Sequence, residues 1–205
     1  MTEKRKVPGP NGKEKAMKLA CLFPGIGYTC DKPLLYYSGK MLRAMGWEVR
    51  QVPYTGFPSG IKGDREKMKA AAELALSQAE KLLQDVNWEG YEEILFVSKS
   101  VGTVVSGLYA IHHHVPCRSV LFTPVEETFQ FIPGKAIVFH GTADPWARSE
   151  AVLEGCRRAG LSLFVTPGAN HSLETGEIEK DIEILGETMK KVSAFIQGEA
   201  AEIQR

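Results

Sequence analysis

Residues 92–103 read Glu-Glu-Ile-Leu-Phe-Val-Ser-Lys-Ser-Val-Gly-Thr, an apolar run followed by small and polar residues. The run from Ile94 to Val97 has no polar alternation and is rich in β-branched and aromatic side chains, which is typical of a parallel strand buried on both faces. Apolar residues then recur at helical spacing from Val101 to Ile111, so we predict a helix directly after the strand. The chain must therefore reverse direction around Ser100.

This reversal is sharp, and the two small residues Ser98 and Gly102 lie two positions either side of Ser100. The turn would project the Ser100 hydroxyl from the carboxyl end of a strand, beside the free N–H groups that begin a helix. That is the geometry of a nucleophile elbow. A plain strand-to-helix turn is an equally good interpretation of these residues alone, because S-x-S-x-G differs from the usual G-x-S-x-G.

Composition restricts the class of protein. A chain of 205 residues is long enough for one domain with a full hydrophobic core. The hydrophobic fraction of 43% and the charged fraction of 24% are those of an ordinary globular protein. Lys plus Arg and Asp plus Glu both number 25, so no excess charge favours nucleic acid or a membrane as the partner.

The four cysteines lie far apart and form no C-x-x-C pair, and Cys21 lies in an apolar run, where we expect a small buried residue. Residues 1–15 lack the apolar centre of a signal peptide, and no apolar stretch is long enough to span a bilayer. These features predict a protein of the reducing cytoplasm.

Predicted strands and helices alternate along the chain, with strands expected at 17–23, 47–52, 94–97, 119–122, 136–140 and 161–166. No repeat or linker divides them. We therefore predict a single-domain α/β fold over residues 16–197, with a doubly wound, mainly parallel sheet of about six strands. Residues 1–15 are expected to form a flexible arm, or at most one half of an edge hairpin, and residues 198–205 a frayed tail.

Helix ends carry recognisable capping residues. Asp31, followed by Pro33, is the expected N-cap of a helix that Gly46 closes, and Asp64 is the expected N-cap of a long amphipathic helix that runs to about Asn87.

Two motifs could indicate a bound ligand. His112-His113-His114 could suggest a metal site, but consecutive helical residues point in different directions, so we interpret it as a helix end before Pro116. Gly25-Ile26-Gly27 follows a strand and suits an anion cradle or an oxyanion hole. It lacks the third glycine of a dinucleotide fingerprint. No cofactor and no metal is predicted.

Parallel strands deliver their carboxyl ends to one edge of a sheet, where ligands bind. The loops at that edge would carry Ser100, Asp144 and His171, in this order. A serine hydroxyl needs an adjacent base, and an imidazole base needs a carboxylate to fix its tautomer. Each residue alone could be a turn former or a cap, but three such residues at successive strand ends favour a catalytic site. His140, inside the strand before Asp144, is expected to be structural.

With these three loops the sequence resembles the α/β-hydrolase superfamily, over nearly the whole chain from Met17 to Ile196. Residues 98–102 resemble its nucleophile elbow, residues 140–144 its acid loop and residues 168–171 its histidine loop. The segment 23–27 is similar to the family's oxyanion segment. The resemblance implies a triad of Ser100, Asp144 and His171, and oxyanion donors in the backbone N–H groups of Ile26 and Val101.

The sequence also departs from the family pattern. Ser98 replaces the glycine before the nucleophile, Pro24 stands where many members have histidine, and Lys99 precedes the nucleophile where histidine is frequent. The chain is expected to begin at the family's third strand, without the early antiparallel strands. The chain is therefore most similar to small, lidless members related to dienelactone hydrolases and short-chain carboxylesterases, with serine where dienelactone hydrolases carry cysteine.

The resemblance implies a serine hydrolase that acts on an ester or thioester of a small molecule. An acyltransferase with the same triad, or a catalytically silent binding protein, are the alternatives. Only residues 123–135 are available where other members insert a cap, so we expect an open site for short acyl or aryl groups. Its expected walls are aromatic: Tyr28, Phe57, Phe129, Phe131 and Trp146.

Overall fold

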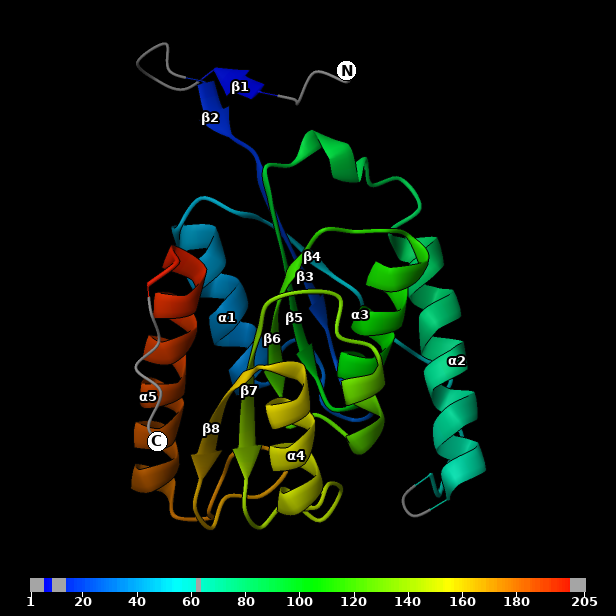
Figure 1. Ribbon diagram of the computed structural model, residues 1–205, viewed down its shortest axis with the longest axis vertical. Helices are drawn as coiled ribbons and strands as arrows, with labels where there is room; N and C mark the ends of the chain where they lie inside the picture. The colour runs from blue at the N-terminus through cyan, green and yellow to red at the C-terminus, as the bar shows by residue number, and fades with distance from the viewer. Residues whose placement is uncertain (1–5, 9–13, 62–63, 200–205) are drawn as a thin grey trace.

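The computed structural model describes residues 6–8, 14–61 and 64–199 and is organised around one six-stranded parallel sheet (Figure 1). The strand order is β4-β3-β5-β6-β7-β8 and every pairing within it is parallel. The strands are β3 (Lys18–Phe23), β4 (Glu48–Gln51), β5 (Glu93–Lys99), β6 (Arg118–Phe122), β7 (Ala136–Gly141) and β8 (Ser162–Thr166). This confirms the predicted α/β class and sheet.

Helices cover both faces of the sheet (Figure 1). On one face lie α1 (Pro33–Ala44) and α5 (Ile178–Gln197), and on the other lie α2 (Arg65–Leu82), α3 (Val101–His112) and α4 (Ser149–Ala159). Two short 3-10 helices complete the described elements, η1 (Trp88–Gly90) and η2 (Glu126–Gln130). The sheet is therefore the middle of three layers, as a doubly wound fold requires.

Strand β3 shows why the central strands lack polar alternation. Leu22 belongs to the apolar cluster under α1 and α5, whereas its neighbours Cys21 and Phe23 belong to the cluster under α2 and α3. All three side chains are fully buried. Because both faces of such a strand are covered by helices, apolar residues are needed at every position.

The chain changes direction across the sheet between β3 and β5, which are hydrogen-bonded neighbours inside it. Strand β4 lies on the outer side of β3, and all later strands lie beyond β5. The connections that follow β3 and β5 therefore leave in opposite directions. A crevice for ligands forms at the carboxyl ends of strands at such a switch point, which is where Ser100 and the β3–α1 loop lie.

The N-terminal part of the chain contains two short strands. Strands β1 (Lys6–Pro8) and β2 (Glu14–Ala16) form a separate two-stranded antiparallel hairpin, at the amino end of β3 (Figure 1). The predicted flexible arm thus contains a hairpin in residues 6–8 and 14–15, while residues 1–5 and 9–13 lie outside the described part. At the other end Gly198, in a left-handed conformation, ends α5, and residues 200–205 of the predicted tail also lie outside it.

Two predicted helix ends are corrected and one cap is confirmed. The Asp64 carboxylate accepts a hydrogen bond from the Lys67 N–H at 3.1 Å, as an N-cap does. Asp31 is not the cap of α1, because Lys32 occupies that position without a side-chain hydrogen bond. Helix α2 ends at Leu82 and not near Asn87, since the chain turns and enters η1.

The connection between β6 and β7 spans residues 123–135 and contains only η2. No cap domain can be built from so short a segment. The carboxyl edge of the sheet is therefore uncovered on this side, as the sequence predicts.

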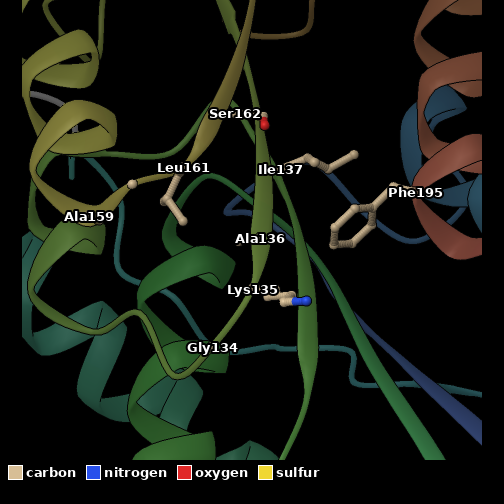
Figure 2. A pocket seen from close by; sticks show the side chains of 9 residues that line it. Gly134, Lys135, Ala136, Ile137, Ala159, Leu161, Ser162 and Phe195 are labelled. Atoms are coloured by element: carbon tan, nitrogen blue, oxygen red, sulfur yellow. The ribbon is translucent and has the colours of Figure 1, made fainter. Parts of the chain in front are cut away.

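A shallow depression of about 470 Å³ lies at the opposite, amino edge of the sheet (Figure 2). Residues at the starts of β7 and β8 line it together with Phe195 of α5. It is separated by the length of the strands from Ser100, which follows the carboxyl end of β5. Its position argues against its being the substrate site.

The described cysteines are all unpaired and buried, which confirms the prediction for Cys21. Within residues 6–8, 14–61 and 64–199, none of the helices combines the length and apolar character needed to cross a membrane.

Candidate active site

Ser100 occupies the strained turn that the sequence predicts. It lies between β5 and α3 with φ of 55° and ψ of −127°, a backbone conformation that non-glycine residues rarely adopt. Its N–H donates to the carbonyl oxygen of Phe122 at the end of β6, at 3.1 Å. The strained backbone is thus tied to the sheet and aims the Ser100 hydroxyl away from both strand and helix.

Gly102 permits the close approach that this turn requires. A Cβ atom at Gly102 would lie 2.4 Å from the carbonyl oxygens of both Phe23 and Pro24. No other residue fits there without displacing backbone. The start of α3 therefore packs directly against the loop that follows β3.

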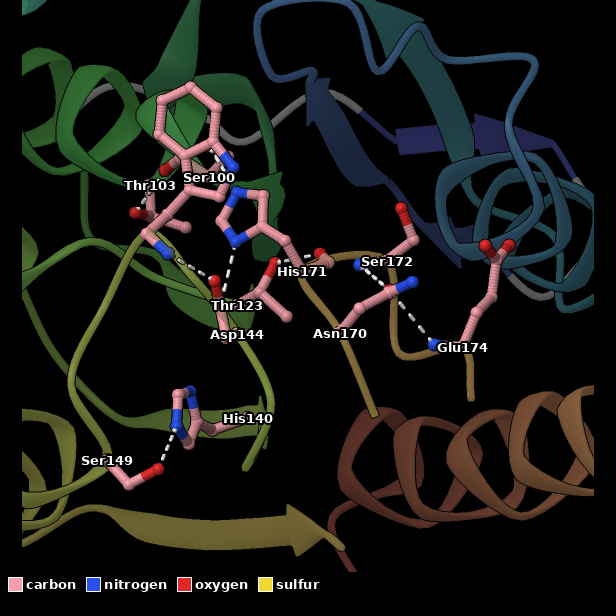
Figure 3. A network of polar contacts seen from close by, with 11 residues as sticks. Ser100, Thr103, Thr123, His140, Asp144, Ser149, Asn170, His171, Ser172 and Glu174 are labelled. Carbon is pink, nitrogen blue, oxygen red and sulfur yellow. Dashed lines mark hydrogen bonds and ion pairs between the residues drawn. The ribbon is translucent and has the colours of Figure 1, made fainter. Parts of the chain in front are cut away.

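The structure brings Ser100, His171 and Asp144 together from three loops of the carboxyl edge (Figure 3). The distance from Ser100 Oγ to His171 Nε2 is 2.8 Å, and that from His171 Nδ1 to Asp144 Oδ2 is 2.7 Å. Because a carboxylate only accepts, His171 donates through Nδ1–H, and its Nε2 accepts from the Ser100 hydroxyl. A hydroxyl, an imidazole and a carboxylate are thus in hydrogen-bond contact, in the order that a nucleophile, its base and an orienting acid require.

Asp144 is held rigidly behind His171. Its side chain is fully buried, and its second oxygen, Oδ1, accepts a hydrogen bond from the Trp146 N–H at 2.8 Å. The Trp146 ring stacks beside the His171 ring, with 5.6 Å between the ring centroids. Both the direction of the carboxylate and the plane of the imidazole are therefore fixed.

Hydrogen bonds also hold the histidine loop to its neighbours. The Thr123 hydroxyl, at the end of β6, donates to the His171 carbonyl oxygen at 2.9 Å (Figure 3). The Thr142 hydroxyl accepts from the Gly168 N–H at 2.8 Å. These contacts join the loops after β6, β7 and β8 into one unit that positions His171.

Burial and charge set the ionisation of the site. Burial lowers the pKa of His171 below its ordinary 6.5 although the Asp144 carboxylate opposes this, and the charge of Lys99 lowers it further. Burial alone would raise the pKa of Asp144, but the hydrogen bond and charge of His171 and the Trp146 N–H outweigh it and hold that pKa below 3.8. At neutral pH the pair is therefore a neutral imidazole and a carboxylate.

The β3–α1 loop brings Gly25, the residue before Ile26, against Ser100. Gly25 pairs with Tyr28 across a tight turn, and a Cβ atom at Gly25 would lie 3.0 Å from Ser100 Cβ. Val101 is the first residue of α3, so its N–H has no carbonyl partner one turn earlier in the helix. The backbone thus suits the predicted oxyanion donors, the N–H groups of Ile26 and Val101, whose role stays a prediction.

Two of the five aromatic residues that were predicted to line the site have buried side chains. Phe129 packs in the core against α4, where a Cβ atom at Gly155 would lie 2.4 Å from its ring, so the structure does not place it at the triad. Tyr28 belongs to the β3–α1 loop, but its ring is buried and its hydroxyl accepts from the Leu34 N–H at 3.0 Å. Neither side chain forms an open wall, because each is needed to fill the core.

The other three predicted aromatic residues are half-buried. Phe57 packs edge-on against Tyr54 on the α2 side of the carboxyl edge, and Phe131 follows η2 beside Gly107 of α3. Trp146, which stacks on His171, directly contacts a triad residue. Trp146 is thus the best placed of the five to touch a substrate.

His140 has the structural position that the sequence predicts for it. Only 1% of it is exposed, and its Nε2 lies 2.8 Å from the Ser149 hydroxyl at the start of α4 (Figure 3). This contact joins β7 to the start of α4. In the described part of the chain, no group of three or more His, Cys, Asp or Glu side chains could hold a metal ion.

The sequence missed two residues that shape the site. Thr123 anchors His171 and adopts a φ of 41°, which no local pattern signals. Lys99 is buried next to Ser100, whereas the sequence showed it only as a departure from a family pattern. The available signal for Lys99 was its position as a charged residue between two small residues at the end of an apolar strand.

Comparisons with known proteins identify the fold. No protein-family model and no curated protein matches the sequence. Solved structures do match. The protein of unknown function ATU1826 from Agrobacterium tumefaciens has a TM-score of 0.58 and 19% identity, with 98% of both chains covered.

Two further matching structures are a hydrolase and an esterase. XC6422 from Xanthomonas campestris, an α/β serine hydrolase without a lid, has a TM-score of 0.55 and 14% identity, with 90% of this chain and 86% of that chain covered. The esterase Pf2001 from Pyrococcus furiosus has a TM-score of 0.58 and 14% identity, with 92% and 89% covered. The chain therefore has the α/β-hydrolase fold, in the small form without a cap domain.

Proposed function

We propose that the protein is a serine hydrolase that cleaves an ester or thioester of a small molecule. The observation that carries the proposal is the unbroken chain of hydrogen bonds from Ser100 through His171 to Asp144, with distances of 2.8 and 2.7 Å. The first residue in this series of hydrogen bonds, Ser100, is held in a strained turn, which is where an α/β-hydrolase nucleophile lies.

In the proposed acylation step, Ser100 Oγ attacks the acyl carbon while His171 Nε2 takes the hydroxyl proton. Asp144 stabilises the resulting imidazolium through the hydrogen bond to Nδ1–H. The negative oxygen of the tetrahedral intermediate accepts from the N–H groups of Ile26 and Val101. His171 then returns the proton to the departing alcohol or thiol, which leaves an acyl ester on Ser100.

Water completes the proposed reaction. His171 removes a proton from a water molecule as that water attacks the acyl carbon, and gives the proton to Ser100 Oγ as the acyl ester breaks. The products are a carboxylic acid and the restored enzyme. The lowered pKa of His171 supports this role, because the imidazole must be neutral in the free enzyme to act as a base.

The proposed substrates have short acyl or aryl groups. The segment 123–135 provides no cap, and Trp146 is the aromatic side chain beside His171. Such a site buries the first carbons of a chain and leaves the rest in water. Since each buried methylene contributes about 0.8 kcal/mol, catalytic efficiency should rise over the first few carbons and then level off.

Hydrolysis of p-nitrophenyl acetate by the wild type, by Ser100→Ala and by Ser98→Ala tests the proposal. Ser98 is a matched control, since its buried hydroxyl contacts the Val120 carbonyl oxygen and not His171. We expect turnover by the wild type and Ser98→Ala and its loss in Ser100→Ala. Turnover by none of the three would support a silent binding protein, and full turnover by Ser100→Ala would exclude the mechanism.

Two additions refine the assay. Methanol as a competing acceptor reports whether the acyl group passes to water or to another acceptor, and methyl ester as the main product at low methanol would favour an acyltransferase. A series from acetate to dodecanoate, below the critical micelle concentration of each ester, reports the depth of the site. Efficiency that keeps rising to dodecanoate would contradict an open, shallow site.

A further inference from the structure

Lys99 is a buried lysine directly next to the nucleophile. Only 1% of it is exposed, at the end of β5 and between two serines. Lysine is rarely buried to this extent, because removing an ammonium group from water is costly unless nearby groups compensate. Its surroundings therefore indicate what its charge does.

The β3–α1 loop holds the whole Lys99 side chain. A Cβ atom at Gly25 would lie 3.4 Å from Lys99 Cδ, so the loop packs on the aliphatic stem. The ammonium nitrogen lies 4.9 Å from the centre of the Tyr28 ring, which is cation–π distance. That ring is in turn fixed by the hydrogen bond from the Leu34 N–H. The charge is therefore held in one place.

The charged groups around Lys99 come from the loops after β7 and β8. The carboxylates of Asp144 and Glu174 favour its ammonium form, but burial outweighs them and lowers the pKa of Lys99 to about 7. Below that pH the side chain is a cation. Since the pKa of His171 is itself below 6.5, Lys99 is charged throughout the range in which His171 titrates.

Contacts through Gly25 and Ser100 connect Lys99 to His171: a Cβ atom at Gly25 would lie 3.4 Å from Lys99 Cδ and 3.0 Å from Ser100 Cβ, and Ser100 Oγ lies 2.8 Å from His171 Nε2. Asp144 favours the imidazolium, whereas Lys99 and His140, when protonated, oppose it. The Asp144 carboxylate alone would stabilise a protonated imidazole that cannot accept the Ser100 proton. A fixed cation on the nucleophile strand offsets part of that stabilisation.

We propose that Lys99 is a positioning residue that acts through His171: its ammonium group, buried against Tyr28, keeps the imidazole in the neutral, proton-accepting form at mildly acidic pH. The inference rests on the proposed function for its consequence in catalysis. The charge effect on His171 can be measured without any turnover.

The decisive variant is Lys99→Met, which keeps an unbranched apolar stem under Gly25 and removes the charge. Lys190→Met is the matched control, because Lys190 lies on the exposed surface of α5, paired with Glu187. NMR titration of the His171 ring in both variants and in the wild type reports its pKa. The pH dependence of kcat/KM for p-nitrophenyl acetate reports the same group in catalysis.

We expect Lys99→Met to raise the pKa of His171 by about 0.5 or more, so that on the acidic limb of the profile kcat/KM falls about threefold further below its plateau than in the wild type. Lys190→Met should change neither quantity. A His171 pKa that is unchanged in Lys99→Met overturns the inference. If that pKa rises but no variant turns over ester, the charge effect stands and the proposed function fails.

The wild type provides a second measurement should Lys99→Met not fold. The His171 ring signals should show a large step below pH 6.5 and a smaller step near pH 7, where Lys99 loses its proton. A single step, with no response to a group that titrates near pH 7, would contradict the inference.

Discussion

His140 and His171 lie on either side of the Asp144 charge, and the fold holds them in different ways. His140 stands in β7, is 1% exposed, and contacts Ser149 through Nε2, while its buried Nδ1 has no partner among the described residues. The His171 side chain stands in a loop, is 16% exposed, and uses both ring nitrogens, one on Asp144 and one on Ser100.

Burial lowers the pKa of both histidines. A lowered pKa is therefore not what distinguishes the proposed base from the structural residue. The difference lies in the partners, because a general base needs a proton donor on one nitrogen and an orienting acceptor on the other. His171 has both, whereas His140 contacts the Ser149 hydroxyl through Nε2 and has no carboxylate on Nδ1 among the described residues.

The largest predicted effect separates the two histidines by the same substitution. His171→Gln should lower kcat by about 10⁴-fold or more, and Ser100→Ala by a similar factor, because each removes the proton transfer. His140→Gln should change kcat by less than about tenfold once the fraction of folded protein is equal, since an amide can still contact Ser149. Steady-state kinetics on p-nitrophenyl acetate measure all three.

The double variant Ser100→Ala/His171→Gln sharpens this test. It should be little worse than either single variant, because the two residues act as a unit. Losses that add, or a His140→Gln variant as inactive as His171→Gln, would show that the proton follows another route.

Much of this arrangement could be predicted from the sequence. Apolar runs without alternation predicted the buried parallel strands, and the order Ser100, Asp144, His171 at successive strand ends predicted three side chains that the structure brings into contact. These features are local or depend only on strand order. Asp64 was predictable as a cap for the same reason, since its hydrogen bond reaches only to Lys67.

The failures share a different cause. The location of Phe129 depends on Gly155 of α4, and the environment of Lys99 depends on the loop of Tyr28. Both are tertiary contacts between residues far apart in the sequence, so composition and spacing carry no signal for them. Thr123 was missed because a hydroxyl at a strand end is common and its bond to His171 crosses between loops.

A second prediction uses pH to isolate His171. Its neutral form is the base and its pKa is lowered from 6.5, so kcat/KM should be constant near neutral pH and fall only at a pH below 6.5, approaching tenfold for each further unit on the acidic limb. A profile of kcat/KM between pH 4.5 and 7.5 measures this. A rate that is flat across that range would contradict His171 as the base.

The smallest predicted effect concerns stability and reports on both histidines. Each has a lower pKa in the folded protein than the ordinary 6.5, so below pH 6.5 the unfolded chain binds more protons and the free energy of unfolding falls with falling pH. His140→Gln should reduce this slope by about 1 kcal/mol per pH unit or less. Urea unfolding at pH 5 and 6.5 tests it. An unchanged slope would mean that His140 does not stay neutral when folded.

The measurement that tests the central claim most directly is reaction with a fluorophosphonate, followed by peptide mass spectrometry. Phosphonylation requires a serine activated by its own base, so we predict a single adduct on Ser100 that is absent from Ser100→Ala and His171→Gln and retained in His140→Gln. An adduct on Ser98, or no adduct on folded wild-type protein, would contradict the account.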